Sequence, residues 1–217
     1  MSRQALYDFD GTVTSKDTTS LLLIELLKLR PWRFTGVLWF LSRLVSSNNS
    51  LSKQEYKNKA IGHLIKNLSE SQLRGALHSF SNKVKFTYRQ SVLKSIDKSI
   101  QDNLTVLIVT ASPSFAIKMC VSDFKVLVLG TEFEKKNDIY TGNINGMNCY
   151  GCEKVNRINK WAKSNNITLN VETAWSDHIS DYDMLHLSRD RNWIGGGKLK
   201  KTLAALDPEA SFLNIDH

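Results

Sequence analysis

The 217-residue chain has few cysteines and no long apolar run, and both absences narrow its class. Its three cysteines are an odd number, which suits a reducing cytosolic compartment better than a disulfide framework. We expect no N-terminal signal, because Arg3, Gln4, Asp8 and Asp10 fall where its apolar region would lie. A hydrophobic content of 41% and a charged content of 23% are ordinary for a soluble globular protein. We therefore expect a cytoplasmic protein with one large domain, or a core and a smaller domain.

The net charge of +8 is concentrated in one part of the chain. Residues 15–89 contain 13 lysines and arginines but only 4 acidic residues, whereas the remainder contains 16 basic and 17 acidic residues. Such charge is typical either of solvated helix faces or of a surface that attracts an anionic substrate or membrane. Nucleic acid is disfavoured as a partner, because no binding motif accompanies the charge. The charge distribution favours a separate module over residues 15–89.

The chain begins with a short apolar strand that runs into two carboxylates, in the stretch Leu6-Tyr-Asp-Phe-Asp-Gly-Thr-Val-Thr14. Side chains two apart on a strand face the same way, so Asp8 and Asp10 are expected to converge just past the strand's end. Gly11 lets the backbone bend there. Two like charges held close stay ionised only if a cation or another partner offsets them. The two acids alone are equally compatible with a solvated turn.

Residues from Thr14 to about Arg89 are predicted to be helical, with a polar linker at Ser46–Ser50 and further helices from about Lys53 to Ile100. The apolar runs Leu21–Leu29 and Phe34–Val45 are each too short to span a membrane. Burial between helices of a small bundle explains both runs. A helical hairpin in a membrane interface, with Trp32 and Trp39 at headgroup depth beside basic residues, is the alternative. The second reading places the protein peripherally at the inner face of the membrane.

Four main strands are expected, one before Asp8 and the others over Leu104–Val109, Lys125–Leu129 and Val171–Ser176, with a short last strand around Asn192–Ile194. Predicted helices over Ser114–Val121 and Lys154–Ser164, and a hairpin over Thr131–Asn145, lie between them. This alternation predicts an α/β fold with a doubly wound parallel sheet. In such sheets, sites form beyond the carboxyl ends of strands. Asp8 and Asp10, Thr110 and Asp177 follow three of these strands.

These strand ends carry the groups that hydrolysis of a phosphate monoester needs. Asp8 is the candidate nucleophile, and Asp10 the candidate acid and base for the leaving oxygen and the attacking water. Mg²⁺ is expected between Asp8, the Asp10 backbone carbonyl and Asp177, with Asp181 in support. Thr110 and the backbone N–H of Ala111 are expected to bind a phosphoryl oxygen. Lys154 is expected to neutralise the nucleophile and the phosphoryl charge.

Taken in order, Asp8-Phe-Asp-Gly-Thr-Val-Thr14, Thr110, Lys154 and Asp177 with Asp181 resemble the four motifs of the haloacid dehalogenase (HAD) superfamily. The helical segment after the first motif resembles the cap of the phosphoserine phosphatase branch. Val109-Thr-Ala-Ser-Pro113, Asn148-Cys-Tyr-Gly-Cys-Glu-Lys154 and Trp175-Ser-Asp-His-Ile-Ser-Asp181 look most like a bacterial branch that includes phosphatidylglycerophosphatase C.

This resemblance implies a Rossmann-like core formed by residues 1–14 and 90–217, a helical cap formed by residues 15–89, and Mg²⁺-dependent phosphatase activity. It also makes Asp17 a candidate substrate contact. His178 and Cys152 depart from the family pattern. Cys149 and Cys152 have redox or zinc spacing, but no second cysteine pair accompanies them.

The substrate stays open between a phospholipid headgroup phosphate, such as phosphatidylglycerophosphate, and a small soluble phosphomonoester. A catalytically silent membrane-binding module is the alternative from another class. The sequence makes no prediction of the oligomeric state.

Overall fold

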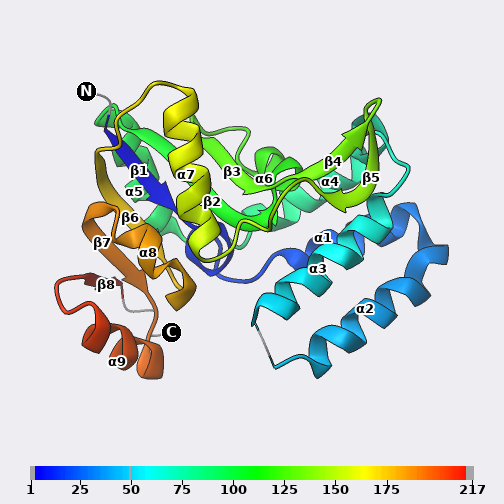
Figure 1. Ribbon diagram of the computed structural model, residues 1–217, viewed down its shortest axis with the longest axis horizontal. Helices are drawn as coiled ribbons and strands as arrows, with labels where there is room; N and C mark the ends of the chain where they lie inside the picture. Colours follow the sequence, from blue (N-terminus) through cyan, green and yellow to red (C-terminus); the bar gives the residue numbers. More distant parts are fainter. Residues whose placement is uncertain (1–2, 49, 214–217) are drawn as a thin grey trace.

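A parallel sheet forms the centre of the computed structural model, which describes residues 3–48 and 50–213 (Figure 1). Its strand order is β3-β2-β1-β6-β7-β8, and every neighbouring pair is parallel. The strands are β1 (Gln4–Tyr7), β2 (Thr105–Pro113), β3 (Leu127–Thr131), β6 (Val171–Ser176), β7 (Ser188–Ile194) and β8 (Ser211–Leu213). This arrangement confirms the predicted α/β fold with a doubly wound sheet.

The strand order reverses direction at β1, which lies between β2 and β6. Residues Leu6 and Tyr7 of β1 pair in register with Leu107 and Ile108 of β2. In an open parallel sheet, the crevice at such a switch point lies beyond the carboxyl ends of the central strands. The three predicted strand-end positions therefore meet at one edge of the sheet.

Alternate side chains of the central strands enter two separate apolar layers, as the period of a strand requires. Ala5 and Tyr7 pack in the layer that includes α5 (Gln90–Gln101) and α6 (Ser114–Cys120). Leu6 packs in the opposite layer, which includes residues of α7 (Cys152–Ser164), α8 (Tyr182–Leu185) and α9 (Gly197–Leu206). The strands are buried on both faces, so their sequences are apolar runs rather than alternating patterns.

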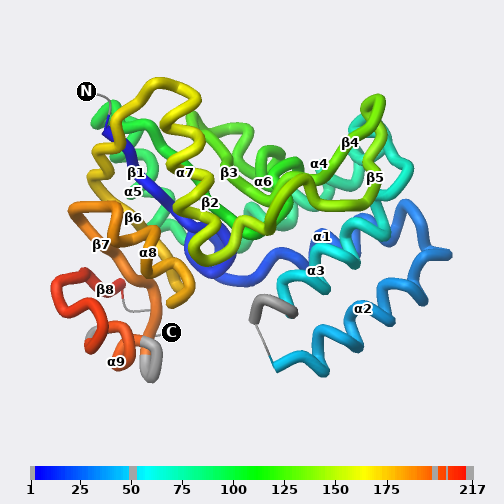
Figure 2. Tube along the Cα trace, viewed as in Figure 1, coloured from blue at the N-terminus to red at the C-terminus, as the bar shows by residue number. Residues whose placement is uncertain are grey.

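Helices follow the turn after β1, as predicted. They are α1 (Thr19–Leu29), the 3₁₀ turn η2 (Pro31–Arg33), α2 (Phe34–Ser46), α3 (Ser50–Ile65) and α4 (Glu70–Lys85). The chain trace leaves the sheet after β1, builds these helices and returns in α5 (Figure 2). Helix α1 packs against α3 and α4, α4 packs against α6, and α2 packs against α3. Residue 49, in the predicted polar linker, lies outside the described residues.

The hairpin of β4 (Phe133–Lys136) and β5 (Ile139–Ile144) holds α3 against the rest of the molecule. Tyr140 donates its N–H to the Leu68 carbonyl at 2.9 Å, and its own carbonyl accepts from Asn67 N at 2.8 Å. The backbones approach so closely that a Cβ on Gly62 would lie 2.0 Å from the Gly142 carbonyl oxygen. A side chain at Gly62 would therefore push the hairpin away from α3.

The outgoing and returning connections of the helical segment run side by side. Ser15 N donates to the Thr87 carbonyl at 2.7 Å, and Arg89 N donates to the Val13 carbonyl at 2.8 Å. The predicted division into a core and a cap falls at this pair of connections. Buried residues of the helical segment and of the sheet form one continuous apolar cluster, so the division into two domains stays a prediction.

Several predicted boundaries are wrong. Strand β2 continues to Pro113 instead of ending at Val109, and β3 begins at Leu127 rather than Lys125. Strand β7 begins at Ser188, and neither α9 nor β8 is predicted from the sequence. Within residues 3–48 and 50–213, no helix combines the length and apolarity needed to span a bilayer.

Candidate active site

The turn after β1 presents Asp8 and brings it close to Asp177. At Gly11 the backbone φ is +83°, and a Cβ there would lie 2.0 Å from Asp177 Oδ2, so only glycine fits. Thr12 Oγ1 lies 3.3 Å from Asp8 Oδ2 and 3.1 Å from Asp177 Oδ1. A hydroxyl has a single proton, which bonds one of these carboxylates at a time. The turn therefore holds two carboxylates, which follow β1 and β6, around one hydroxyl.

Lys154 is the buried cation of this cluster. It lies in the first turn of α7, and its Nζ is 2.6 Å from Asp8 Oδ1 and 2.7 Å from Asp181 Oδ2. Only 2% of Lys154 is exposed, so solvent screens neither ion pair. Ser176 at the end of β6 donates a further hydrogen bond to Asp181 Oδ2 at 2.6 Å. One lysine therefore compensates two buried carboxylates directly.

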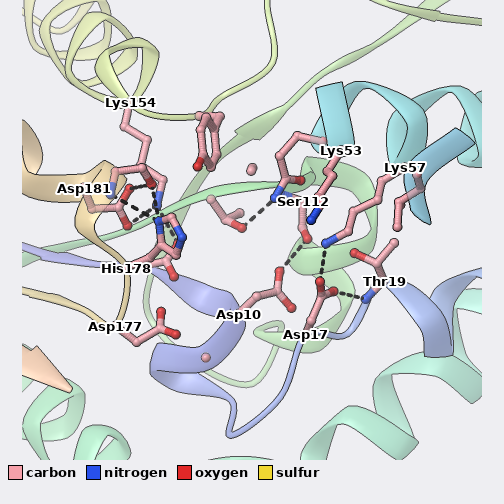
Figure 3. A pocket seen from close by; sticks show the side chains of 18 residues that line it. Asp10, Asp17, Thr19, Lys53, Lys57, Ser112, Lys154, Asp177, His178 and Asp181 are labelled. Atoms are coloured by element: carbon pink, nitrogen blue, oxygen red, sulfur yellow. Dashed lines mark hydrogen bonds and ion pairs between the residues drawn. The ribbon is translucent and has the colours of Figure 1, made fainter. Parts of the chain in front are cut away.

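Asp10 points toward the helical segment and β2 rather than toward Lys154 (Figure 3). Its Oδ1 accepts from both Thr18 N and Thr18 Oγ1 at 2.7 Å, and its Oδ2 accepts from Ser112 Oγ at 2.5 Å. Burial raises the pKa of Asp10, and the nearby charge of Asp17 raises it further, against these hydrogen bonds. On balance, this environment stabilises the protonated form of Asp10 relative to that of an exposed aspartic acid.

The end of β2 supplies the predicted phosphate-binding positions. The β2–β3 ladder is interrupted between Val109 and Pro113, so Thr110–Ser112 leave the regular pairing. Thr110 is buried, and its hydroxyl accepts from Ser112 N at 3.0 Å. The carbonyl of Ala111 accepts from Thr131 Oγ1 at 2.7 Å. These bonds hold the segment against the sheet at the carboxyl end of β2.

Across the cleft from Lys154, α3 contributes two lysines (Figure 3). Asp17 forms an ion pair with Lys57 and accepts from Thr19 N at 2.8 Å. Burial would raise the pKa of Asp17, but the charge and hydrogen bond of Lys57 outweigh burial and lower it. Lys53 lines the same side. All predicted site residues line this single cleft of about 530 Å³, namely Asp8, Asp10, Asp17, Thr110, Ala111, Lys154, Asp177 and Asp181.

A family model described as haloacid dehalogenase-like hydrolase matches residues 5–186, and this span contains every residue of the cleft. The chain belongs to this hydrolase family. No curated protein matches the sequence of this hydrolase.

Solved structures share its fold at low sequence identity. A protein of unknown function from Bordetella pertussis Tohama I has a TM-score of 0.78 and 18% identity, with 98% of both chains covered. A conserved, functionally unknown protein from Anaerococcus prevotii has a TM-score of 0.69 and 12% identity, covering 97% of this hydrolase and 85% of that chain.

A phosphoserine phosphatase, solved as a phospho-aspartyl intermediate analogue, has a TM-score of 0.61 and 16% identity, covering 100% of this hydrolase and 94% of that chain. The fold is therefore similar to that of phosphoserine phosphatase. These comparisons give no support to the closer resemblance to phosphatidylglycerophosphatase C.

The two carboxylates around Thr12 have perturbed pKa values. Burial raises the pKa of Asp8 well above its ordinary value, and the charges of Asp181 and Asp177 add to this against the opposing Lys154. Burial also raises the pKa of Asp177, with a further increase from Asp181 and an opposing hydrogen bond from Thr12. The hydrolase thus holds more buried negative charge here than Lys154 balances.

This donor set fits a hard divalent cation. Asp8 and Asp177 offer carboxylate oxygens, the ligand type that Mg²⁺ prefers. The Thr12 hydroxyl has one proton for these two carboxylates, so one of them is left without that hydrogen bond. Within the part of the chain that the structure describes, no three acidic, histidine or cysteine side chains gather closely enough to hold a metal by themselves. The carboxylate of Asp10 is engaged by Thr18 and Ser112, which leaves the role of third protein ligand to a backbone carbonyl.

Three hydroxyl residues that order the acids are not among the site residues predicted from the sequence, namely Thr12, Thr18 and Ser112. Thr12 and Ser112 lie within the motifs that supply Asp8, Asp10 and Thr110, so hydroxyl residues this close to the acids could have been predicted as their hydrogen-bond donors. Thr18 offers no such signal. Between Asp177 and Asp181, His178 caps a 3₁₀ turn over Ile179–Asp181, and its Nδ1 accepts from Ser180 N.

The cysteine pair departs from a redox or zinc site. Cys149 is buried and Cys152 is exposed, and both are free thiols. Burial raises the pKa of the Cys149 thiol to about 12, so it stays protonated at neutral pH. The two thiols therefore differ in their environment, and of the pair Cys152 is the one at the surface.

Proposed function

We propose that this hydrolase is a Mg²⁺-dependent phosphatase that cleaves a phosphate monoester through an aspartyl-phosphate on Asp8. The observation that carries the proposal is the environment of Asp8, which has Lys154 at one oxygen and, at the other, the Thr12 hydroxyl that Asp177 shares. Lys154 holds the Asp8 carboxylate in one orientation and offsets its charge, as an attacking carboxylate requires. The family membership and the phosphatase-like fold support the same chemistry.

The chain's own residues divide the reaction into two displacements. An Asp8 oxygen forms a bond to phosphorus as the ester oxygen leaves, and protonated Asp10 gives that oxygen its proton. Water then attacks phosphorus and gives a proton to Asp10, and the phosphorus–oxygen bond to Asp8 breaks to release phosphate. The raised pKa of Asp10 suits the first step, since it makes this carboxyl hold its proton more readily than an exposed aspartic acid does.

The remaining groups of the cleft bind the phosphoryl oxygens and the metal. Lys154 supplies positive charge, while the Thr110 hydroxyl and the Ala111 N–H supply hydrogen bonds. Mg²⁺ would be held by Asp8, Asp177 and the Asp10 backbone carbonyl, and when bound it supplies positive charge that offsets the phosphoryl oxygens. Asp181 acts through Lys154, to which it is bonded at 2.7 Å.

We propose a phospholipid headgroup phosphate, such as phosphatidylglycerophosphate, as the substrate. Lys57 already neutralises Asp17, so among the described residues on the side of the cleft opposite Lys154 no acid is left without a partner to bind a substrate amine. Lys53 on the same side adds positive charge. These charges favour a phosphate monoester that carries a second anionic group, as a phosphorylated phospholipid headgroup does. A small soluble phosphomonoester, phosphoserine-like or a sugar phosphate, is the second candidate, and the phosphoserine phosphatase fold favours it.

The test is phosphate release from a panel that contains phosphoserine, sugar phosphates and phosphatidylglycerophosphate in micelles, each with Mg²⁺ and with chelator. We expect Asp8→Asn to abolish turnover while the fold stays intact, because asparagine has the same shape. Asp183→Asn is the matched control, since Asp183 is an exposed acid close to the same motif and does not line the cleft. Turnover by Asp8→Asn, or wild-type turnover unaffected by chelator, would reject this mechanism.

A further inference from the structure

The helix α2 has an outward face that no other part of the described chain covers. Trp32 just before it is 72% exposed, Trp39 is 53% exposed and Val45 is 80% exposed. Phe34 and Leu38 are also exposed, and these five residues define the α2 face. Exposed apolar residues of this size in one short segment mark an interaction site more often than scattered surface residues do.

The opposite side of α2 accounts for its packing within the fold. Val37 is fully buried, and a Cβ on Gly36 would lie 2.4 Å from His63 Nε2 of α3. The Phe40 ring lies 6.0 Å from the His63 ring, centroid to centroid. The sequence alone is compatible with burial of the whole apolar run in a bundle, but the structure buries only this side. The α2 face is apolar for another reason.

The chain around the α2 face is mostly basic, and the acids directly beyond residues 18–54, Asp17 and Glu55, are each paired with a lysine. From Thr18 to Gln54 the sequence has five basic residues, Lys28, Arg30, Arg33, Arg43 and Lys53, and a single acid, Glu25. Glu25 is buried and paired with Lys28 at 2.7 Å and with Lys83 at 2.5 Å. Arg43 lies over the Trp39 ring, 5.5 Å from its centroid. The segment presents apolar and cationic groups together, with no solvent-exposed acid.

The α2 face lies next to the mouth of the cleft. Helix α2 lies at the edge of the molecule away from the sheet (Figure 1). Its last turn contributes Leu44 to the cleft lining, which also includes Lys53 and Gln54 of α3. Val45, on the outward face, follows Leu44 directly. A surface that contacts Val45 would therefore be close to the cleft.

We propose that the α2 face docks on the surface of a membrane that contains anionic lipid. Amphipathic helices bind such surfaces through buried apolar area and through attraction of basic residues to anionic headgroups, with tryptophan at headgroup depth. A second copy of the chain is a poorer occupant, because a symmetric contact would bring the two sets of basic residues together. The docking itself does not depend on phosphatase activity, although it would bring a lipid phosphate to the cleft.

The test is co-sedimentation of the full chain with vesicles of phosphatidylcholine, with and without phosphatidylglycerol. We expect binding to the anionic vesicles only. In 1 M salt, where the screening length is about 3 Å, binding should weaken but persist, because the apolar part does not depend on salt. Asp8→Asn protein should bind equally well, which separates docking from turnover.

Two variants and a matched control identify the surface. Trp39→Glu and Val45→Glu should each weaken vesicle partitioning, Trp39→Glu by at least about tenfold, because apolar area is lost and a repelled charge is gained. Met147→Glu changes a residue that is 69% exposed and outside the α2 face, and should bind like wild type. Circular dichroism of each variant checks the fold.

Failure of the wild-type protein to co-sediment with anionic vesicles at low salt would overturn the proposal. Binding that survives both Trp39→Glu and Val45→Glu in folded protein would also overturn it. A concentration-dependent dimer that both variants dissolve, without vesicle binding, would assign the face to self-association instead.

Discussion

Replacement of Lys154 by methionine tests whether this buried cation holds the cleft together. Methionine keeps an unbranched apolar stem of similar length but removes the charge that bonds Asp8 and Asp181 at 2.6 and 2.7 Å. All three side chains are buried, so water from the cleft replaces the lost partner only in small part. The variant therefore leaves two carboxylates in a low-dielectric site with no direct cation.

Breaking a buried ion pair by removing one partner costs about 3–5 kcal/mol, because an uncompensated charge stays behind. Two pairs share Lys154, but protonation of Asp8, whose pKa is already raised, limits the penalty. We therefore expect Lys154→Met to lower the free energy of unfolding by about 3–5 kcal/mol at pH 7. Adding Asp181→Asn removes one of the stranded charges, so the double variant should be more stable than the sum of single effects by about 0.5–3 kcal/mol.

The measurement is urea denaturation of the four proteins of this cycle, followed by circular dichroism with chelator present so that metal binding adds nothing. Asp183→Asn serves as the surface control. A loss below about 1 kcal/mol for Lys154→Met would match an exposed pair and would refute the inference of a charge-critical lysine. Strict additivity in the cycle would show that Asp181 does not act through Lys154.

Two further predictions concern the helical segment and the first turn. Burial alone would raise the pKa of Glu25, but hydrogen bonds from Lys28 and Lys83 outweigh burial and lower it to about 2. A lowered folded-state pKa stabilises the protein above the unfolded value of about 4.3 and loses that effect as the pH falls toward the folded-state pKa. At pH 7 the free energy of unfolding of wild type should therefore exceed that of Glu25→Gln by about 1–2 kcal/mol, a modest difference because the two lysines are exposed. In urea titrations this difference should close between about pH 5 and 2. A difference that stays constant with pH would contradict the prediction. Gly11→Ala should cost more than the about 1–2 kcal/mol of a left-handed backbone and should abolish turnover, because its Cβ displaces Asp177. Gly146→Ala is the matched control, because Gly146 has a similar φ of +82° but open space around it, so its loss of stability measures the backbone cost alone. Equal losses of stability and turnover for the two variants would contradict a role for the close contact with Asp177.

The strands beside the switch point could be predicted because long apolar runs end in polar residues. Strand β6 matches its predicted bounds of Val171–Ser176, whereas β8 has only three residues and too little pattern to detect. Helix α9 begins at Gly197, directly after two other glycines that are typical of a loop, but residues 198–206 are mostly lysine, leucine and alanine, so propensity could have indicated this helix. The bounds of β2 differ because Thr110–Ser112 stay extended after leaving the ladder with β3.

The predicted site residues meet because strand ends in a parallel sheet meet, and this needs only their positions in the sequence. The orientation of each carboxylate is a different matter. Asp8 and Asp10 are two residues apart and were expected to converge, yet Asp8 bonds Lys154 while Asp10 bonds Thr18 and Ser112. Gly11 sets the path of the turn, and hydroxyl partners set the rotamers. Neither effect has a spacing rule.

The position of Asp10 ties the chemistry of the cleft to the helical segment. Thr18, the residue before α1, donates two hydrogen bonds to one Asp10 oxygen, while Ser112 of β2 donates to the other. A shift of α1 relative to the sheet would have to break one of these sets of bonds. The proton affinity of Asp10 depends on both, because hydrogen bonds to the ionised form lower its pKa against burial and against Asp17. The pKa of Asp10, the residue proposed to protonate the leaving group, therefore depends on the position of the segment that carries the α2 face. If docking of that face shifts α1, the shift would reach proton transfer in the cleft through Thr18, since the side chain of Asp8 bonds instead to Lys154 of α7 and Thr12 of the first turn.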